Sequence, residues 1–227
     1  MQGGSRKKQR LPYPNQYILD TSGIAVPNRI MPLGDSITQG LNDITNGGWR
    51  KGLDADLVTD GRNVLFVGSG ADGSFTNNLH EGHSGYFTSQ ILTDLLRYLD
   101  NWKPDVVLLM IGTNDCATGD ITGAANNLAL ILDVIHRWRF KCWINVANCP
   151  QNTNSTINTN INTYNALIPG IVSARTSVGR RIRASVAGQQ CGSGNLGGDG
   201  THPTTTGYNN IRATLRTDMN AILNTWV

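Results

Sequence analysis

Apolar residues along the chain fall into short runs that alternate with longer segments of helical spacing. The run 106–111 is apolar at every position, which is typical of a strand covered on both faces of a parallel sheet. In segment 89–99, the isoleucine and four leucines lie on one face of a helix. These patterns predict strands at 30–33, 63–68, 105–112, 142–148 and 181–186. They predict helices at 48–60, 89–99, 121–139, 156–177 and 204–226.

This alternation predicts the α/β class, as a three-layer α/β/α sandwich with a five-stranded parallel sheet of flavodoxin-like type and right-handed crossovers. A chain of 227 residues fits one such domain, which we assign to residues 29–227. Residues 1–28 show no clear period and are interpreted as an N-terminal extension that wraps the surface. Ligands of such sheets bind beyond the carboxyl ends of the strands, so polar residues that follow strands are the candidates for chemistry.

The net charge of +3 arises at the N-terminus, where Arg6, Lys7, Lys8 and Arg10 lie within ten residues that contain no acid. The rest of the chain is close to neutral, so nothing argues for a nucleic-acid surface. No apolar stretch is long enough to span a bilayer, and no apolar leader is visible. Low charge content (15%), many Asn and Thr residues and one Asn-Ser-Thr sequon at 154–156 favour a secreted protein that has lost its leader.

The four cysteines, Cys116, Cys142, Cys149 and Cys191, lack the Cys-x-x-Cys spacing of metal sites. They are also too few for a scaffold that depends on disulfides in a chain of this length. One or two disulfides, or none, are compatible with the sequence. Cys116 is interpreted as a disulfide partner or a buried thiol rather than as a nucleophile.

The first candidate for chemistry is Ser36, in Gly-Asp-Ser-Ile-Thr-Gln-Gly at 34–40, directly after a predicted strand. A serine there can cap a following helix, because serine is favoured at that position. It can equally serve as a nucleophile, which gains from the positive end of the helix dipole. The Gly-x-Ser-x-Gly elbow of α/β-hydrolases is absent from the chain, which argues against that architecture.

A base and an acid occur together in Asp-Gly-Thr-His-Pro at 199–203. Asp199 can accept the Nδ1–H of His202, which leaves Nε2 free to face a serine. The alternative is that Asp199 only forms a turn with Gly200. The presence of Ser36 at the same predicted sheet edge favours a Ser36–His202–Asp199 catalytic triad.

Donors for a developing oxyanion are expected at the same edge. Asn114, in Gly-Thr-Asn-Asp at 112–115, can offer its side-chain amide, although such a residue can also close a strand through an Asx turn. Gly85 can bring a backbone N–H close to a ligand because it lacks a Cβ. The expected oxyanion hole therefore consists of Ser36, Gly85 and Asn114, with Gly68 as a weaker candidate than Gly85.

A metal site at His80, Glu81 and His83 is disfavoured, because the histidines are three rather than four residues apart and glycines interrupt the segment. The segment is interpreted as a loop at the rim of the site. No phosphate-binding glycine motif occurs at 34–40. We therefore expect no required cofactor and no catalytic metal, while a structural calcium site is left open by the sequence.

With these residues in order, the chain resembles the SGNH hydrolases of the GDSL esterase superfamily. The blocks that carry the resemblance are 34–38, 112–115 and 199–202, and the block around Gly85 matches least sharply. Further segments resemble carbohydrate esterase family 3, whose members are known as acetylxylan esterases. These segments are Ile-Met-Pro-Leu-Gly-Asp-Ser at 30–36, Phe-Val-Gly-Ser at 66–69, His-Glu-Gly-His-Ser-Gly-Tyr at 80–86 and Tyr-Asn-Ala-Leu-Ile-Pro-Gly-Ile at 164–171.

The resemblance implies an SGNH fold, a cofactor-free serine triad and removal of O-acetyl groups from plant-cell-wall polysaccharide such as xylan. It implies an acetylated polysaccharide or oligosaccharide as substrate, and we expect a monomer with no nucleic-acid or membrane partner. The Asn/Thr-rich segment 151–163 does not follow the family pattern. Alternatives are a lipase or thioesterase, a metal-dependent deacetylase and a non-catalytic carbohydrate-binding protein. Tyr86 and Trp49 are aromatic candidates for sugar contact, or for the core.

Overall fold

A six-stranded parallel sheet forms the centre of the computed structural model, which describes residues 18–19, 25–26, 28–45 and 47–225. Five strands run in the order β4-β3-β6-β7-β8, and the short β5 pairs with the end of β3. The strands are β3 (Asn28–Gly34), β4 (Val64–Phe66), β5 (Glu81–Gly82), β6 (Val106–Met110), β7 (Trp143–Ala147) and β8 (Ile182–Ser185). The predicted α/β class and parallel sheet are confirmed.

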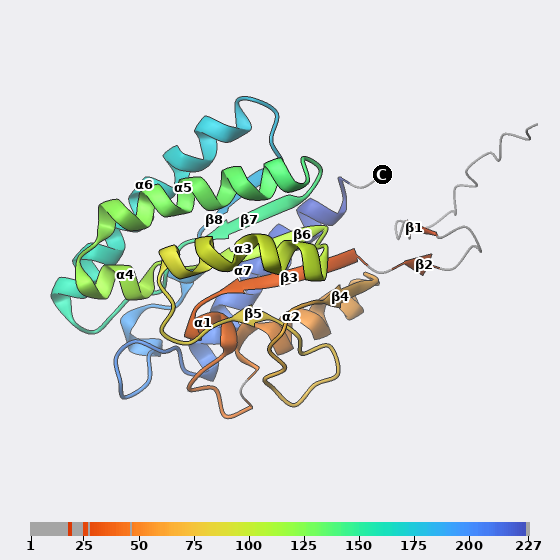
Figure 1. The fold of residues 1–227 in the computed structure, drawn as a ribbon. Coiled ribbons are helices and arrows are strands. Elements are labelled where there is room, and N and C mark those ends of the chain that lie inside the picture. Colours follow the sequence, from red (N-terminus) through yellow and green to blue (C-terminus); the bar gives the residue numbers. More distant parts are fainter. Residues whose placement is uncertain (1–17, 20–24, 27, 46, 226–227) are drawn as a thin grey trace, which may run out of the picture.

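Helices cover both faces of this sheet (Figure 1). On one face lie α3 (Thr88–Trp102), α5 (Ile121–Trp138) and α6 (Ser155–Thr176), packed in one hydrophobic cluster. On the other face lie α2 (Gly48–Thr59) and α7 (Thr205–Leu223), packed in a second cluster. The three-layer arrangement expected from the sequence is therefore present.

Strand β6 shows why the apolar run 106–111 folds as a central strand. All five residues of β6 are buried, and alternate residues enter opposite cores. Val107 and Leu109 join the cluster under α3 and α5, whereas Val106 and Leu108 join the cluster under α2 and α7. A strand with helices on both faces needs apolar side chains at every position.

Several elements differ from the sequence-based prediction. Strand β5 is additional to the five predicted strands, and its two residues are too few to produce a periodic signal. Two short helices, α1 (Ser36–Gln39) and α4 (Thr113–Thr118), begin directly after β3 and β6. The 3-10 turns η1 (Gly188–Gln190) and η2 (Ser193–Asn195) lie between β8 and α7. The main sheet begins at Asn28, one residue before the predicted domain boundary.

In the predicted extension, β1 (Ile18–Leu19) and β2 (Ala25–Val26) form an antiparallel pair. The rest of segment 1–27, and with it the prediction that this segment wraps the surface, lies outside the described residues. Within the described ranges, no helix is long and apolar enough to cross a membrane. All four cysteines are buried as free thiols, so the disulfide alternatives are wrong.

Candidate active site

The end of β3 delivers Ser36 to the carboxyl edge of the sheet. Gly34 closes the strand, Asp35 caps α1 by accepting the backbone N–H of Ile37 at 2.9 Å, and Ser36 is the first helical residue. A Cβ at Gly34 would lie 2.0 Å from the carbonyl oxygen of Met110, so only glycine allows β3 and β6 to pair here. Ser36 does not cap the helix itself, because Asp35 has that role.

Asp35 is fully buried beside Ser36. Burial raises the pKa of its carboxyl group to about 6, although the hydrogen bond from Ile37 partly opposes this rise. One carboxylate oxygen caps α1, and the other makes no hydrogen bond within the described part of the chain. Asp35 was not singled out from the sequence, because the burial of a carboxyl group is decided by the layers that cover it.

Ser36, His202 and Asp199 come together although the serine and the acid are 163 positions apart in sequence. The Oγ of Ser36 lies 2.8 Å from Nε2 of His202, and Nδ1 of His202 lies 2.6 Å from Oδ2 of Asp199. If Ser36 donates to Nε2, then Nδ1 carries the proton that it donates to Asp199. The serine is 6% exposed, whereas the side chains of His202 and Asp199 are 21% and 48% exposed.

The Asp199 carboxylate also organises the loop that carries it. Its Oδ1 accepts the backbone N–H groups of Thr201 at 2.9 Å and His202 at 3.0 Å. Burial tends to raise the pKa of Asp199, but the bonds from Thr201 and His202 outweigh burial and lower the pKa to about 2. The carboxylate is therefore ionised at every pH at which the protein would act, and it can hold the imidazole in one tautomer.

Three possible donors lie on segments that follow neighbouring strands: Ser36 after β3, Gly85 after β5 and Asn114 after β6. The N–H of Ser36 is at the first position of α1, where no intrahelical acceptor exists. The N–H of Gly85 makes no hydrogen bond among the described residues, and the φ of +77° at this position favours glycine. The Nδ2 of Asn114 donates to the carbonyl oxygen of Tyr86 at 2.9 Å, which links Asn114 to the loop of Gly85 and leaves a second amide proton.

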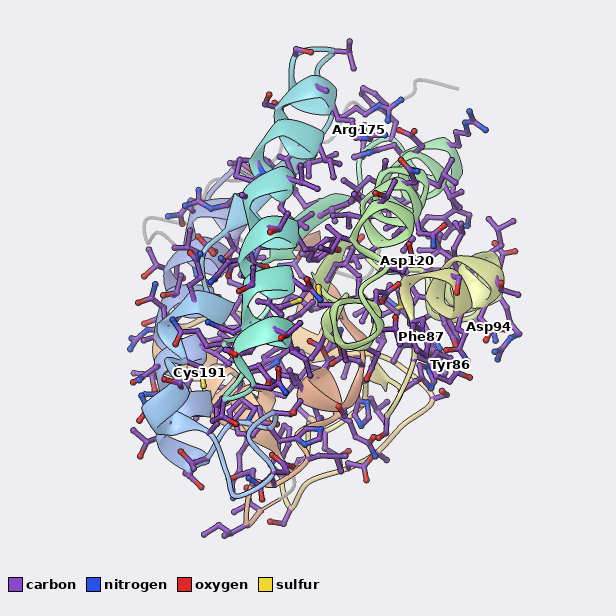
Figure 2. The ribbon with its side chains drawn as sticks, turned by 90° about the vertical axis from the view of Figure 1, so that its left-hand side faces the viewer. Tyr86, Phe87, Asp94, Asp120, Arg175 and Cys191 are labelled. Atoms are coloured by element: carbon purple, nitrogen blue, oxygen red, sulfur yellow. The ribbon has the colours of Figure 1, made fainter. Side chains whose placement is uncertain are left out.

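The loop of Gly85 is fixed to the sheet by its neighbours. The N–H of His83 donates to the carbonyl of Gly34 at 2.9 Å, which places the loop beside the residue that leads to Ser36. The ring of His83 stacks between those of Tyr86 and Tyr98, with centroid distances of 4.7 and 5.3 Å. Figure 2 shows Tyr86 and Phe87 next to each other at the start of α3. Gly68 is explained by packing instead, since a Cβ there would meet the backbone of His80.

The segment His80-Glu81-Gly82-His83 is engaged in internal hydrogen bonds. Glu81 accepts from Nε2 of His83 at 2.7 Å and from both the N–H and the hydroxyl of Ser69. His80 turns the other way, with Nε2 at 3.1 Å from Asp72 and Nδ1 accepting the N–H of Gly82. Over the described residues, no cluster of three or more His, Cys, Asp or Glu side chains could hold a metal ion.

The structure also shows the positions of Trp49, whose role the sequence left undecided, and of Arg50, which the sequence analysis did not identify. Trp49 is 1% exposed and belongs to the core with α7, so the suggestion that it contacts a sugar is wrong. Arg50 is fully buried and donates to the carbonyl oxygens of Thr38 at 2.9 Å and Gln39 at 2.8 Å, at the end of α1. Arg50, which lies on α2, therefore fixes the end of α1, the helix that begins with Ser36. Nothing in the sequence distinguishes this arginine from those at the surface.

Known proteins share the sequence pattern and the fold of this chain. Residues 33–209 match the model of the GDSL-like lipase/acylhydrolase family. The solved structure of a family 3 carbohydrate esterase from Clostridium thermocellum is 30% identical, with a TM-score of 0.79 over 88% of this chain and 98% of that one. A carbohydrate esterase family 3 structure from Talaromyces cellulolyticus has a TM-score of 0.78 at 24% identity, over 88% of this chain and 100% of that one.

A multidomain esterase from Ruminococcus flavefaciens is 36% identical over an alignment of 131 residues, and the match covers 47% of this chain. The match spans only 17% of that relative's length. The family match covers most of the chain and includes Ser36, Asn114, Asp199 and His202. The chain therefore belongs to the GDSL-like lipase/acylhydrolase family, and its fold and family are those of carboxylic ester hydrolases.

Proposed function

We propose that this protein hydrolyses O-acetyl esters of plant-cell-wall carbohydrate such as acetylated xylan, with Ser36, His202 and Asp199 as its catalytic triad. The observation that carries the proposal is the continuous chain of contacts from Ser36 Oγ to His202 Nε2 (2.8 Å) and from His202 Nδ1 to Asp199 Oδ2 (2.6 Å). Nucleophile, base and orienting acid are the parts that acyl transfer through serine requires.

The reaction proceeds in two halves. His202 Nε2 takes the hydroxyl proton of Ser36 while Oγ attacks the carbonyl carbon of the acetyl ester. The tetrahedral intermediate collapses, the carbon–oxygen bond to the sugar breaks, and the sugar oxygen takes the proton from His202. Water then gives a proton to His202 and attacks the acetyl group on Ser36, so that acetate leaves and the serine is restored. His202 carries every proton, and the proposal therefore requires no cofactor.

Three hydrogen-bond donors are assigned the role of stabilising the negative charge on the oxygen of the tetrahedral intermediate. They are the N–H groups of Ser36 and Gly85 and the side-chain amide of Asn114. Two observations support this assignment: the two N–H groups have no acceptor among the residues that the structure describes, and Asn114 is hydrogen-bonded to the loop of Gly85. Removal of one such donor elsewhere costs about 3 kcal/mol in the barrier, or roughly a hundredfold in rate. Asn114→Ala is expected to lose turnover by that factor.

The acetylated carbohydrate is supported by the resemblance of segments 80–86 and 164–171 to carbohydrate esterase family 3 and by the Clostridium thermocellum relative of that family. An extracellular location is part of the proposal, because such a polymer lies outside the cell. The test is acetate release from acetylated xylan beside hydrolysis of acyl esters of increasing chain length. A preference for long acyl chains would contradict this assignment and indicate a lipid or a thioester as the substrate.

The catalytic roles are tested by single substitutions on a small acetyl ester. Ser36→Ala should abolish turnover while the circular dichroism spectrum and the melting temperature stay close to those of the wild type. Asp199→Asn should lower turnover less than Ser36→Ala, because Asp199 orients the base without touching the ester. Retained turnover in Ser36→Ala would refute the mechanism, and loss of activity with a chelator would favour a metal-dependent deacetylase.

A further inference from the structure

The loop that carries Asp199 and His202 is held together by its own hydrogen bonds. The Asp199 carboxylate accepts the N–H groups of Thr201 and His202, and the N–H of Gly197 donates to the carbonyl of His202 at 2.8 Å. These bonds fix the acid and the base relative to each other. They do not fix either residue relative to Ser36, which lies on a different element.

A second segment, the Asn/Thr-rich strap 151–154, ties this loop to the body of the protein. The Nδ2 of Asn152 donates to Oγ1 of Thr201 at 3.0 Å, and the N–H of Thr153 donates to the carbonyl of Gly200 at 3.0 Å. Thr201 stands between Asp199 and His202 in sequence. The strap therefore contacts the two residues that separate the acid from the base.

Asn152 is itself held by two further hydrogen bonds, one through its side chain and one through its backbone. Its Oδ1 accepts the N–H of Asn154 at 2.8 Å, and its backbone N–H donates to Oδ1 of Asn158 at 3.1 Å. Asn154 in turn caps α6 by accepting the N–H of Thr156 at 3.0 Å. Asn152 itself is only 6% exposed. A rigid connection thus runs from the start of α6 through Asn152 to Thr201.

We propose that Asn152 is a positioning residue that keeps His202 Nε2 at hydrogen-bond distance from Ser36 Oγ. The proposal rests on the triad mechanism above and adds a residue that touches neither substrate nor reacting atoms. Proton transfer requires a heavy-atom separation of about 2.6–3.2 Å, and a misplacement of about 1 Å can cost about a hundredfold in rate. The loop has a further contact with the segment that follows Ser36, a long hydrogen bond of 3.5 Å from Asn42 Nδ2 to the carbonyl oxygen of His202. The two strap bonds are shorter, at 3.0 Å each, and they hold the residues between the acid and the base.

The variant Asn152→Ala should fold, because the backbone bond from Thr153 to Gly200 and the rest of the core remain. Its kcat on a small acetyl ester should fall about tenfold with KM within about twofold, since the reacting groups are displaced but the binding surface is kept. Thr201→Val removes the hydroxyl group that accepts the hydrogen bond from Asn152, and its kcat should fall by a similar factor. Thr201→Ser keeps the hydroxyl and should stay within about twofold of the wild type.

A matched control is Asn77→Ala, beside the edge strand β4. Asn77 also uses both ends of its amide, accepting from the N–H of Phe66 at 2.7 Å and donating to Asp54 at 2.7 Å. This control should lower the free energy of unfolding as much as Asn152→Ala does, without changing kcat. It separates a loss of catalytic geometry from a general loss of stability.

The double variant Asn152→Ala/Thr201→Val completes a mutant cycle. Its kcat should be no lower than that of Asn152→Ala, because the bond between Asn152 and Thr201 is already lost in each single variant. Losses in kcat that multiply, or equal kcat for Asn152→Ala and Asn77→Ala, would overturn the positioning role. If Asn152→Ala does not fold, the contrast between Thr201→Val and Thr201→Ser decides the same point. Ser36→Ala is run in parallel, since retained turnover there refutes the triad and not merely the strap.

Discussion

Protonation of His80 should make the protein sensitive to acid. The imidazole is 1% exposed, and burial lowers its pKa from 6.5 to about 4, with a further contribution from the nearby Arg50 charge and some opposition from Asp72. The unfolded chain therefore takes up a proton below pH 6.5 that the folded protein refuses until about pH 4. Stability from this group is complete above pH 6.5 and is lost as the pH falls.

The size of the effect follows from the two pKa values. Each unit of difference is worth about 1.4 kcal/mol, so the full loss below pH 4 is about 3 kcal/mol, and about 2 kcal/mol is lost by pH 5. This is a large fraction of the roughly 5–15 kcal/mol by which domains are stable. Asp35 acts in the opposite direction, because its raised pKa favours the folded state as the pH falls below about 6.

The assay is urea unfolding followed by tryptophan fluorescence at pH 7 and pH 5, for the wild type and for His80→Asn. Asparagine keeps an acceptor for the N–H of Gly82 but does not titrate, and Asp35 is present in both proteins. The free energy of unfolding of the wild type should fall by about 2 kcal/mol more than that of the variant. Equal losses in the two proteins would show that His80 does not carry the acid sensitivity.

Two substitutions and one labelling experiment test the packing around the site. Gly34→Ala places a Cβ 2.0 Å from the carbonyl oxygen of Met110; we expect a loss of about 3 kcal/mol in thermal unfolding, and an unchanged melting temperature would contradict the close approach. Tyr164→Phe removes a buried bond of 3.1 Å to the carbonyl of Ile111, at a cost of about 1 kcal/mol in urea unfolding. Burial raises the pKa of all four cysteine thiols; a colorimetric thiol reagent at pH 8 should therefore react only after denaturation, and rapid reaction of the folded protein would refute their burial.

Local patterns were enough to place the main elements. The predicted helix at 121–139 and strand at 142–148 correspond to α5 and β7, because apolar periodicity is a property of neighbouring residues. The short β5 escaped prediction, because two residues cannot show a period. Trp49 was left open between sugar contact and core, because only packing against α7 decides its burial.

The sequence by itself determined the chemical parts and the edge of the sheet at which they meet, since parallel strands bring the residues that follow them to one side. Ser36 and the pair Asp199 and His202 were predicted in this way. Their separation, the pKa of Asp35 and the contact of Asn152 with Thr201 were decided only by the tertiary structure. Distances and desolvation depend on segments that are far apart in the chain and meet only when the layers close.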